Sequence, residues 1–412
     1  MRPLVLPCVR TCAEPQGPAE VFPRLYGKLL IVSLLSVSMF VFLLLFFLRP
    51  AESATTNTTL SCVDDQGNAV DWFYIYKLPH PHEQPPEEGL KYLLLQEHSK
   101  AWMEGGGLIG DSTGALGRSL GPMYEEGELG YILYNDQPPE QRGVNGANRS
   151  GGHTKGVVLF NSRQGFWLVH STPHFPPPKT VGKFSYPSSG INNGQNFICV
   201  TYPLERFNTI GEQLKINQPH VYDCEIPESL TASVPSMVEL CKHQHGWNNF
   251  TATDGSFSTP NRSVSLLSLA GTKFISFAKG ATFDNDLYHS WVAPTLQTDL
   301  LVQFWRRSTG ILPSDCSPSW KVLNVHLLSP GGLVTYKTTE DHSKWAASLG
   351  GGGARGGAWV CVGDINRNEA EEKRGGGTVC QQDVAVWKAY RAAALQCDSC
   401  TGEVDECESA PM

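Results

Sequence analysis

The amino-acid sequence predicts an α+β protein with a sizeable sheet, and its length, composition and local patterns all lead to that class. The chain has 412 residues, of which 41% are hydrophobic and 17% charged, so it can form a large core and is unlike a disordered chain. Its 41 glycines and 28 prolines indicate many loops. Short apolar segments of strand character are mixed with scattered helical ones, as in α+β folds. The length suffices for two domains or one large duplicated domain.

Nine short segments are predicted as strands. The first, VDWFYIYKLP at residues 70–79, is rich in aromatic and β-branched residues and ends at a proline. Residues 156–160 and 166–169 are expected to form a hairpin around a turn at 162–165, and NDQPP at 135–139 is a turn cluster. The other strands are expected at residues 91–95, 128–134, 273–278, 300–305, 322–328 and 359–362.

Three segments show helical patterns, at residues 204–214, 235–243 and 384–395. Two glycine-rich stretches, at 350–357 and 375–377, lack the strand–loop–helix order of a phosphate-binding P-loop. They are therefore interpreted as flexible hairpin loops.

The N-terminal part predicts a membrane-targeting segment. A basic leader at residues 1–28 precedes an uninterrupted apolar run at 29–48, which is long enough to span a bilayer. Ala51 and Ser53 offer a small-x-small cleavage site, so a cleaved signal peptide and an uncleaved signal anchor both remain open. Either way, the positive leader places everything after the run in the lumen, beginning with a polar stalk at 49–61.

The cysteines and glycosylation sequons agree with that topology. Ten of the 12 cysteines follow the apolar run, and an even number in an oxidising lumen indicates disulfides. Cys397 and Cys400 form a C-x-x-C pair, but no second Cys/His pair with zinc-finger spacing accompanies them. All four sequons follow the run, at Asn57, Asn148, Asn249 and Asn261.

Charge depends strongly on pH in this chain. A formal charge of −8 at pH 7 disfavours general attraction of a polyanion. Full protonation of the 12 histidines, whose ordinary pKa is about 6.5, would bring the balance to about +4. An acidic compartment would therefore make the surface compatible with nucleic acid.

A His-x-Lys motif is the main chemical signal. His153 and Lys155 open GGHTKGVVLF, and His342 and Lys344 lie in EDHSKW. On an extended strand such a pair would share one face, because side chains alternate with period two. Each pair offers an imidazole and an ammonium to one phosphate, and two pairs could close on a phosphodiester from both sides. A third copy, HSK at 98–100, is followed by neither a strand nor an apolar run.

Several longer sequence stretches, called phrases below, contain or accompany these motifs. Eight occur in order between about residues 70 and 397: VDWFYIYKLP, LYNDQPP, GGHTKGVVLF, GFWLVHSTPHFPPP, VQFW, GILPS, EDHSKW and CVGDINRNEAEEKRGGGTVC. In these phrases the chain resembles the deoxyribonuclease II family, metal-independent acid endonucleases of the phospholipase D superfamily. The resemblance implies a pseudo-dimer of two phospholipase-D-like halves, at residues 62–225 and 226–397, with a tail at 398–412. Mixed sheets flanked by helices and stapled by disulfides would share one cleft.

The resemblance also implies a set of site residues. They are His153, Lys155, His342, Lys344, Asp364, Asn366 and His170. The first four are the two motifs, Asp364 and Asn366 would support the second motif, and His170 would play a corresponding part in the first half. The third His-x-Lys copy lies outside every matching phrase. Trp305 and three other tryptophans are interpreted as cleft-wall or core residues, with base stacking as the alternative.

The family's paired cysteines imply three disulfides, Cys62–Cys199, Cys316–Cys397 and Cys361–Cys380. Two further pairs, Cys224–Cys241 and Cys400–Cys407, are expected in addition to the family's own.

The implied chemistry is phosphodiester hydrolysis without a cofactor or metal. Lys155 and Lys344 would neutralise the phosphate, one neutral histidine would attack phosphorus and form a phosphohistidine, and the other would protonate the leaving 5′ oxygen. His153 is taken as the nucleophile and His342 as the acid, although the sequence itself leaves that choice open. The products would carry 3′-phosphate and 5′-hydroxyl ends. Acid would be required because the neighbouring lysines lower the pKa of both histidines.

The expected partner is double-stranded DNA in a lysosome or an equivalent acidic compartment. Membrane attachment would follow if residues 29–48 were retained, and no obligate protein partner is evident. Secretion is an alternative location. Two alternative functions are a catalytically inactive DNA-binding relative and a phosphodiesterase acting on lipid.

Overall fold

The structure is a computed structural model that describes residues 59–81, 83–139, 151–244, 260–351 and 356–407. The leader, the apolar run and all but the end of the stalk lie outside these residues, as do the sequons at Asn57, Asn148 and Asn249. Within the described ranges, no helix combines the length and apolarity needed to cross a membrane.

Eight antiparallel strands from residues 72–225 form the first sheet. In spatial order they are β10 (Val221–Glu225), β6 (Gly130–Asn135), β7 (Lys155–Phe160), β8 (Gln164–His170), β9 (Gln195–Pro203), β3 (Trp72–Lys77), β4 (Tyr92–Gln96) and β5 (Met103–Glu104). A separate two-stranded sheet joins β1 (Cys62–Val63) to β2 (Ala69–Val70).

Strands from residues 261–406 form the second, 11-stranded sheet. Its main path is β11 (Asn261–Leu267), β12 (Lys273–Lys279), β19 (Gly376–Gln382), β18 (Trp359–Gly363), β17 (Trp345–Ser348), β13 (Leu300–Gln303), β15 (Lys321–Leu328), β20 (Ala394–Asp398) and β21 (Val404–Glu406). β14 (Asp315–Cys316) and β16 (Tyr336–Lys337) also pair with β15. The β13–β15 pair is parallel. Residues 398–407, expected as a tail, thus continue into β21.

Five strands follow the same path in both sheets. In the first sheet the spatial order is β6-β7-β8-β9-β3, and in the second it is β13-β17-β18-β19-β12. All neighbouring pairs in both paths are antiparallel. Within each path the strand written last comes first in the chain and the others follow in order. Each strand position in one path therefore has a defined equivalent in the other path.

The sheets share a core, and each has a second core on its opposite face. In β3, Trp72 and Tyr74 point into the shared core, whereas Phe73 and Ile75 point to the core under α2 (Ala115–Leu120). This alternation is expected of a strand buried on both faces. Hydrogen bonds also join the sheets, such as the Tyr74 hydroxyl donating to Gln381 Oε1 at 2.7 Å.

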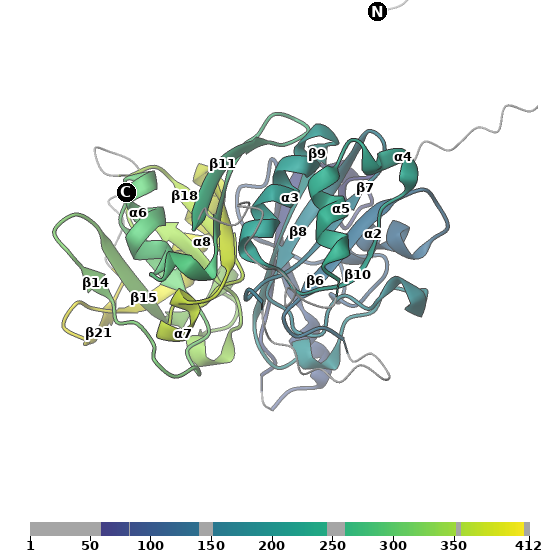
Figure 1. Cartoon of the computed structure of the whole chain (residues 1–412). Coiled ribbons are helices and arrows are strands. Elements are labelled where there is room, and N and C mark those ends of the chain that lie inside the picture. The colour runs from purple at the N-terminus through teal and green to yellow at the C-terminus, as the bar shows by residue number, and fades with distance from the viewer. Residues whose placement is uncertain (1–58, 82, 140–150, 245–259, 352–355, 408–412) are drawn as a thin grey trace, which may run out of the picture. The chain divides into compact units, whose positions relative to one another are not determined.

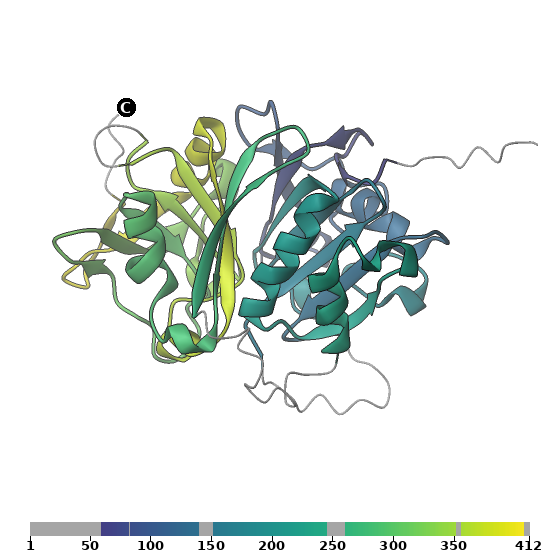
Figure 2. The same cartoon turned by 45° about the horizontal axis from the view of Figure 1, so that its top comes forward.

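Helices add to the shared core. α3 (Glu205–Asn217) lies beside α5 (Pro235–Lys242), and both views show the two together on the first sheet's side (Figures 1 and 2). α3 buries Phe207, Ile210 and Leu214, which have the spacing of one helical face. α8 (Val384–Ala393) is preceded by Asp383, whose carboxylate caps two of its backbone N–H groups. The shorter helices are α4 (Glu228–Thr231), α6 (Ala293–Leu296) and α7 (Glu369–Glu372).

The α+β class is confirmed, and each of the nine strands and three helices predicted has a counterpart. The sequence reading missed β9, a central strand of nine residues. Gln195, Asn196 and Thr201 in β9 are polar but buried, so the segment lacks the apolar pattern of a buried strand. The predicted strand at 300–305 ends at Gln303, and Trp305 leaves the sheet.

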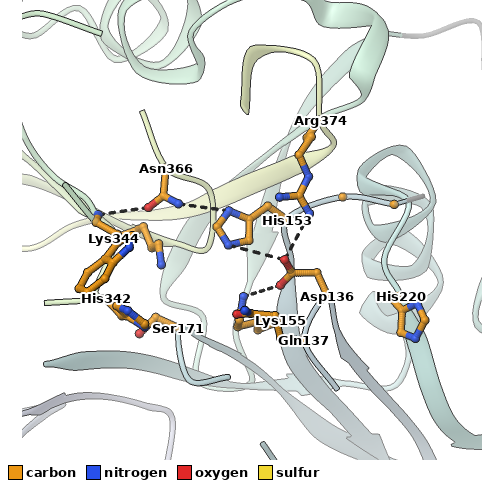
Figure 3. Close-up of a pocket in the computed structure, with 13 residues that line it drawn as sticks. Asp136, Gln137, His153, Lys155, Ser171, His220, His342, Lys344, Asn366 and Arg374 are labelled. Carbon is orange, nitrogen blue, oxygen red and sulfur yellow. Dashed lines mark hydrogen bonds and ion pairs between the residues drawn. The ribbon is translucent and has the colours of Figure 1, made fainter. Parts of the chain in front are cut away.

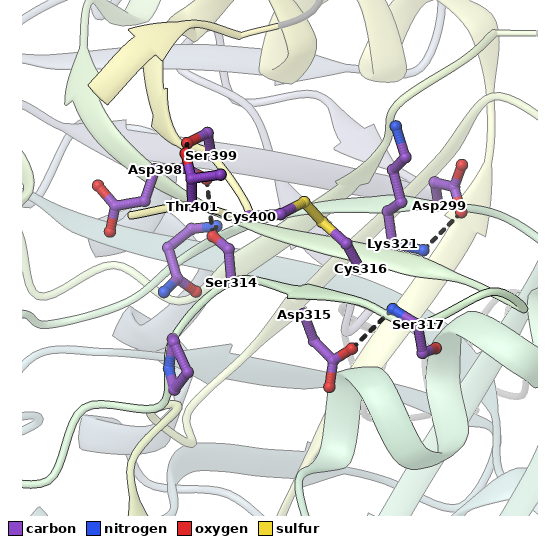
Figure 4. Close-up of a disulfide and its surroundings, with 12 residues drawn as sticks. Asp299, Ser314, Asp315, Cys316, Ser317, Lys321, Asp398, Ser399, Cys400 and Thr401 are labelled. Atoms are coloured by element: carbon purple, nitrogen blue, oxygen red, sulfur yellow. Dashed lines mark hydrogen bonds between the residues drawn. A yellow bond between two sulfur atoms is a disulfide. The ribbon is translucent and has the colours of Figure 1, made fainter. Parts of the chain in front are cut away.

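The described residues form five disulfides, and three match the expected pairs: Cys62–Cys199, Cys361–Cys380 and Cys224–Cys241. The other two expected pairs are wrong. Cys316 bonds to Cys400, not to Cys397, and Cys397 bonds to Cys407. Figure 4 shows the Cys316–Cys400 bridge, and next to it Ser314 donates a 2.8 Å hydrogen bond to the Asp398 carbonyl. The β20–β21 hairpin pairs Cys397 with Asp405, which brings Cys407 close to Cys397 and turns Cys400 away.

Candidate active site

One pocket of about 470 Å³ receives both His-x-Lys pairs. Figure 3 shows them converging from two sides, with Asp136, Asn366 and Arg374 between and around them. Its remaining lining residues are Gln137, Gly151, Gly152, Ser171, His220 and Trp305. The structure therefore brings together five of the seven expected site residues, and leaves Asp364 and His170 off the pocket wall.

Neither histidine lies on a strand. His153 precedes β7, which begins at Lys155, and His342 and Lys344 both precede β17. The expected placement of each pair on one strand is therefore wrong, although both side chains of each pair line the same pocket. The pairs are fixed by the backbone of the opposite half: His153 N donates to the Gly375 carbonyl, and His342 N to the Gly194 carbonyl, each at 2.8 Å.

The lysine backbones are fixed in the same crossed way. Lys155 N donates to Asp364 Oδ2 at 3.4 Å, and Lys344 N donates to Asn196 Oδ1 at 3.2 Å. Asp364 also accepts from Gly377 N at 3.3 Å, and burial raises its pKa to about 7. Asp364 is therefore placed as a support for the Lys155 backbone, although it was expected to support the second motif.

Two carboxylates flank His153. Glu371 Oε1 lies 2.9 Å from His153 Nδ1, and Asp136 Oδ2 lies 3.8 Å from His153 Nε2. The Asn366 amide is also near Nδ1, at 3.4 Å, while its oxygen accepts from Trp305 N at 3.1 Å. Burial lowers the pKa of His153, and the two carboxylates oppose that shift.

These carboxylates belong to a compact charge network. Asp136 pairs with the Lys155 ammonium and, at 3.2 Å, with Arg374 Nη2. Arg374 also pairs with Glu371, again at 3.2 Å. Despite burial, the neighbouring cations hold the pKa of Asp136 well below its usual range and lower that of Glu371 to about 2. Both carboxylates are therefore charged at acidic pH.

His342 has a different environment. Its ring meets the Trp305 ring edge-to-face, with centroids 3.9 Å apart. In the described part of the chain, no carboxylate lies within ion-pair distance of it. Burial, together with the charges of Lys344 and Lys155, lowers the pKa of His342 to about 2. His342 is therefore neutral at pH 5.

Lys344 is also strongly affected by its surroundings. Its side chain is buried at the pocket wall, and burial together with the nearby Lys155 lowers its pKa to about 7. Lys344 is therefore a full cation only below neutral pH.

Other predicted histidines lie elsewhere. His170, the last residue of β8, is fully buried, and its ring lies against Phe175 and Phe197. Its Nδ1 accepts from Thr172 N at 3.2 Å. Burial lowers the pKa of His170 well below its ordinary value, so its geometry is that of a neutral core residue. The third motif, HSK at 98–100, exposes both His98 and Lys100.

Asp136, Glu371 and Arg374 are site residues that sequence reasoning missed. All three lie inside recognised phrases, LYNDQPP and CVGDINRNEAEEKRGGGTVC. Asp136 was interpreted only as part of a turn, and Glu371 and Arg374 precede residues 375–377, which were interpreted as a flexible loop although Gly376 and Gly377 belong to β19. Of the tryptophans considered, Trp305 lines the pocket. Within the described ranges, no three His, Cys, Asp or Glu side chains are grouped as ligands of a metal ion.

Comparison with known proteins places this chain in a family. The Deoxyribonuclease II family profile matches residues 61–400. The chain is 44% identical over 356 residues to Deoxyribonuclease-2-alpha of Sus scrofa, covering 84% of this chain and 92% of that protein. It is 43% identical to Deoxyribonuclease-2-alpha of Mus musculus over 85% of this chain and 95% of that protein. It is also 35% identical to Plancitoxin-1 of Acanthaster planci, over 89% and 99% respectively.

These matches span most of the described chain and define a class of nucleases. The chain belongs to the deoxyribonuclease II family. The resemblance inferred from the phrases, and the enzyme class that it implied, are thereby confirmed.

Proposed function

We propose that this chain is a metal-independent acid endodeoxyribonuclease that hydrolyses DNA phosphodiesters through a phosphohistidine, using two His–Lys pairs in one cleft. The observation on which this rests is that His153, Lys155, His342 and Lys344 line a single pocket. The family relatives are named as deoxyribonucleases, which favours DNA as the substrate.

We also infer that the fold is a pseudo-dimer of two phospholipase-D-like halves. Two observations support this inference: both sheets contain the same five-strand path, and the backbone N–H of each motif histidine bonds to a carbonyl of the opposite half. Gly194 immediately precedes β9 and Gly375 immediately precedes β19, so the two acceptor carbonyls occupy equivalent positions. Each histidine is thus held by the same element of the other half.

The surroundings of the histidines favour His342 as the nucleophile and His153 as the acid. A nucleophile must be neutral, and the pKa of His342 is lowered to about 2. A general acid must be protonated, and the carboxylates of Asp136 and Glu371 favour a protonated His153. Paired titratable groups whose environments separate their pKa values commonly divide acid and base roles in this way. This choice reverses the one made from the sequence.

The proposed reaction has two steps. The His342 imidazole attacks phosphorus while the bond from phosphorus to the 5′ oxygen breaks, and His153 gives its proton to that oxygen. A 3′-phosphohistidyl enzyme and a free 5′-hydroxyl end result. His153, now neutral, then takes a proton from water as the water oxygen attacks phosphorus. The bond to His342 breaks, which leaves a 3′-phosphate and restores both histidines.

Positive side chains would stabilise the charge that develops on the phosphoryl oxygens. Lys155, Lys344 and Arg374 all line the pocket. Preorganised cations stabilise such charge more strongly where they are removed from water, as the side chains of Lys155 and Lys344 are. Lys155 and Arg374 are balanced by Asp136 before substrate binds, which limits the cost of burying them together.

The same arrangement explains an acidic pH range. Burial lowers the pKa of His153, so its protonated form is present only below the ordinary histidine range and is lost as the pH rises. The pKa of Lys344, lowered to about 7, adds a second loss of positive charge near neutral pH. We therefore propose an acidic compartment such as the lysosome, or a secreted enzyme acting at low pH.

Plasmid cleavage in EDTA, at pH 5 and pH 7.5, tests this function. The wild-type protein is expected to nick and linearise plasmid at pH 5, and His153→Ala and His342→Ala are expected to lose at least about 100-fold in rate. His98→Ala, in the exposed third motif, is the matched control and should retain activity. A folded wild-type protein that binds DNA without cutting it would support the inactive relative, and cleavage of phospholipid alone would support the lipid phosphodiesterase.

A substrate with sulfur in place of the bridging 5′ oxygen tests the roles of the two histidines. A thiolate leaves without needing a proton, so a missing general acid matters little. In single-turnover cleavage, His153→Ala is therefore expected to release the 5′-thiol at close to the wild-type rate, whereas His342→Ala should remain inactive. Only this first step recovers, because hydrolysis of the phosphohistidine still needs His153 as a base. Recovery by His342→Ala alone would restore the opposite assignment.

A further inference from the structure

Two buried lysines outside the pocket occupy equivalent places in the two halves. Lys77 is the last residue of β3, and Lys279 is the last residue of β12, the strand at the same position in the second sheet. Their exposed fractions are 0% and 1%. Neither lines the site, and the proposed reaction uses neither.

Lys77 holds the loop that leads into β9. Its ammonium donates to the carbonyls of Ile191 and Asn193, each at 2.6 Å. The next carbonyl in the chain, that of Gly194, accepts the 2.8 Å hydrogen bond from His342 N. The Gly194 N–H in turn donates to the Glu340 carbonyl at 2.8 Å, so the loop and the His342 segment are bonded in both directions.

Lys279 does the same for the loop that leads into β19. Its ammonium donates to the carbonyls of Glu371, Glu372 and Arg374 at 2.9, 2.8 and 2.7 Å. The next carbonyl, that of Gly375, accepts the 2.8 Å hydrogen bond from His153 N. The end of α7 and this loop also supply the side chains of Glu371 and Arg374, respectively, to the charge network beside His153.

The two arrangements agree in detail. Each lysine bonds the carbonyls three positions and one position before the glycine that anchors a histidine: Ile191 and Asn193 before Gly194, and Glu372 and Arg374 before Gly375. The glycine then begins the approach to the strand that pairs with the lysine's own strand, since β3 pairs with β9 and β12 with β19. The same set of long-range hydrogen bonds, from lysine to loop carbonyls and from histidine to glycine, therefore occurs in both halves.

Burying an ammonium is unfavourable, and an apolar side chain of similar size often serves stability as well or better. Here desolvation lowers the pKa of Lys77 to about 7 and that of Lys279 to about 8. Charge-assisted hydrogen bonds fix loop carbonyls more strongly than neutral ones, which offsets the cost of burial. A buried ammonium is costly, yet one occurs at equivalent positions in both halves. This recurrence points to a role in positioning the site and not in stability alone.

We propose that Lys77 and Lys279 are positioning residues, each of which holds the segment whose glycine carbonyl anchors the histidine of the opposite half. Lys77 thereby positions His342, and Lys279 positions His153 together with Glu371. The inference rests on the proposed function, because it concerns the placement of the two reacting histidines. It makes each half-site depend on a buried cation in the other half.

The test compares Lys77→Met and Lys279→Met on ordinary DNA and on the 5′-phosphorothiolate oligonucleotide at pH 5. Each variant should lose roughly 10- to 100-fold in kcat on ordinary DNA with little change in KM, since small misplacements of reacting groups have effects of this size. In single-turnover release of the 5′-thiol, Lys279→Met should recover, as His153→Ala does, and Lys77→Met should not, as His342→Ala does not. Each lysine variant should therefore show the same response to the two substrates as the alanine variant of the histidine that its lysine positions. General destabilisation would reduce activity on both substrates equally, so it cannot produce this crossed pattern.

Lys273→Met is the matched control, because Lys273 is exposed at the other end of β12 from Lys279. If a methionine variant is not obtained folded, the arginine variant at the same position retains the charge but relocates the donors, and the same pattern is expected of it. Lysine variants as active as the Lys273→Met control, or variants that do not follow their histidines, would overturn the inference. Full activity of His153→Ala and His342→Ala would instead show that the proposed function itself had failed.

Discussion

Asp136 and Trp305 occupy equivalent positions beside the two histidines, but only one of them is charged. Asp136 follows β6 and Trp305 follows β13, and the strand registers place each of them opposite the middle residue of its own His-x-Lys motif. Asp136 lies near His153 Nε2, whereas the Trp305 ring meets the His342 ring. The two matching strand paths therefore hold the two histidines in electrostatically different surroundings.

A second pair of equivalent positions shows the same difference. Glu371 lies four residues before Gly375, and Gly190 lies four residues before Gly194. Glu371 contacts His153, while Gly190 has no side chain to offer to His342. Both carboxylates beside His153 thus lack a counterpart beside His342, which is the physical basis for giving the histidines different roles.

Replacing Glu371 by glutamine should move the pH range of activity downward. The carboxylate favours protonated His153, so its loss lowers the pKa of that histidine, and acid catalysis then requires more acid. We expect the midpoint of the pH profile of kcat/KM to fall by about one unit, a typical effect of one close carboxylate. Glu369→Gln, on the exposed side of the same helix, is the control and should leave the midpoint unchanged. An unchanged or raised midpoint in Glu371→Gln would contradict the role given to His153.

Replacing Lys344 by methionine should remove a large part of catalysis at pH 5. Lys344 lines the pocket and is charged below about pH 7, so its loss removes a fixed cation near the phosphoryl oxygens. We expect kcat to fall by about 10²- to 10³-fold, as for the loss of one stabilising group in other enzymes. Lys100→Met tests the same substitution in the exposed third motif and should retain the wild-type rate. Cleavage is measured in single turnover. Similar losses of rate in both variants would show that Lys344 has no specific role in catalysis.

The two motifs could be found from the sequence because each is a local pattern inside a recognisable phrase. Their partners could not, since Asp364 reaches Lys155 across 209 positions and Glu371 reaches His153 across 218. Asp136 was visible only as part of a turn, and nothing local indicates that this turn faces His153. Electrostatic differences between equivalent sites are set by such long-range contacts, so the choice of nucleophile could not be made before the structure.

The fold shows a similar limit. A strand such as β3 is predicted well because its first five residues, WFYIY, are all of strand type. β9 was missed because Gln195 and Asn196 are polar, yet both are buried where Ser171 and Lys344 meet them. Cys397 and Cys400 differ by three positions, and only the turn between β20 and β21 decides which of them reaches Cys316. Residues that serve the site or a turn thus depart from the local patterns of the elements that contain them.

Disulfide mapping by mass spectrometry tests that last point. Unreduced protein is cleaved before Asp398, which separates Cys397 from Cys400. Peptides linking Cys316 to Cys400 and Cys397 to Cys407 are then expected. A Cys397→Ser variant should leave Cys407 as a free thiol and keep the Cys316–Cys400 bridge. A peptide linking Cys316 to Cys397 in the wild-type protein would contradict the observed pairing.

His170 should make the fold less stable as the pH falls. Burial, with a contribution from Lys155, lowers its pKa well below the ordinary value, so it stays neutral in the folded state while it becomes protonated in the unfolded chain. The sign follows directly: below about pH 6.5 the unfolded state binds one more proton, and the free energy of unfolding decreases with falling pH. At pH 5 this contribution amounts to about 2 kcal/mol.

A His170→Asn variant isolates this effect, because asparagine can keep an acceptor for Thr172 N but does not titrate. Between pH 7.5 and pH 5, its free energy of unfolding should improve relative to wild type by about 2 kcal/mol, whatever the difference at pH 7.5. Urea unfolding at several pH values measures this change, and other titrating groups such as His342 cancel in the comparison. His98→Asn, at an exposed position, should give the wild-type pH dependence. Parallel curves for His170→Asn and wild type would mean that His170 becomes protonated in the folded protein, and its assignment as a neutral core residue would then fail.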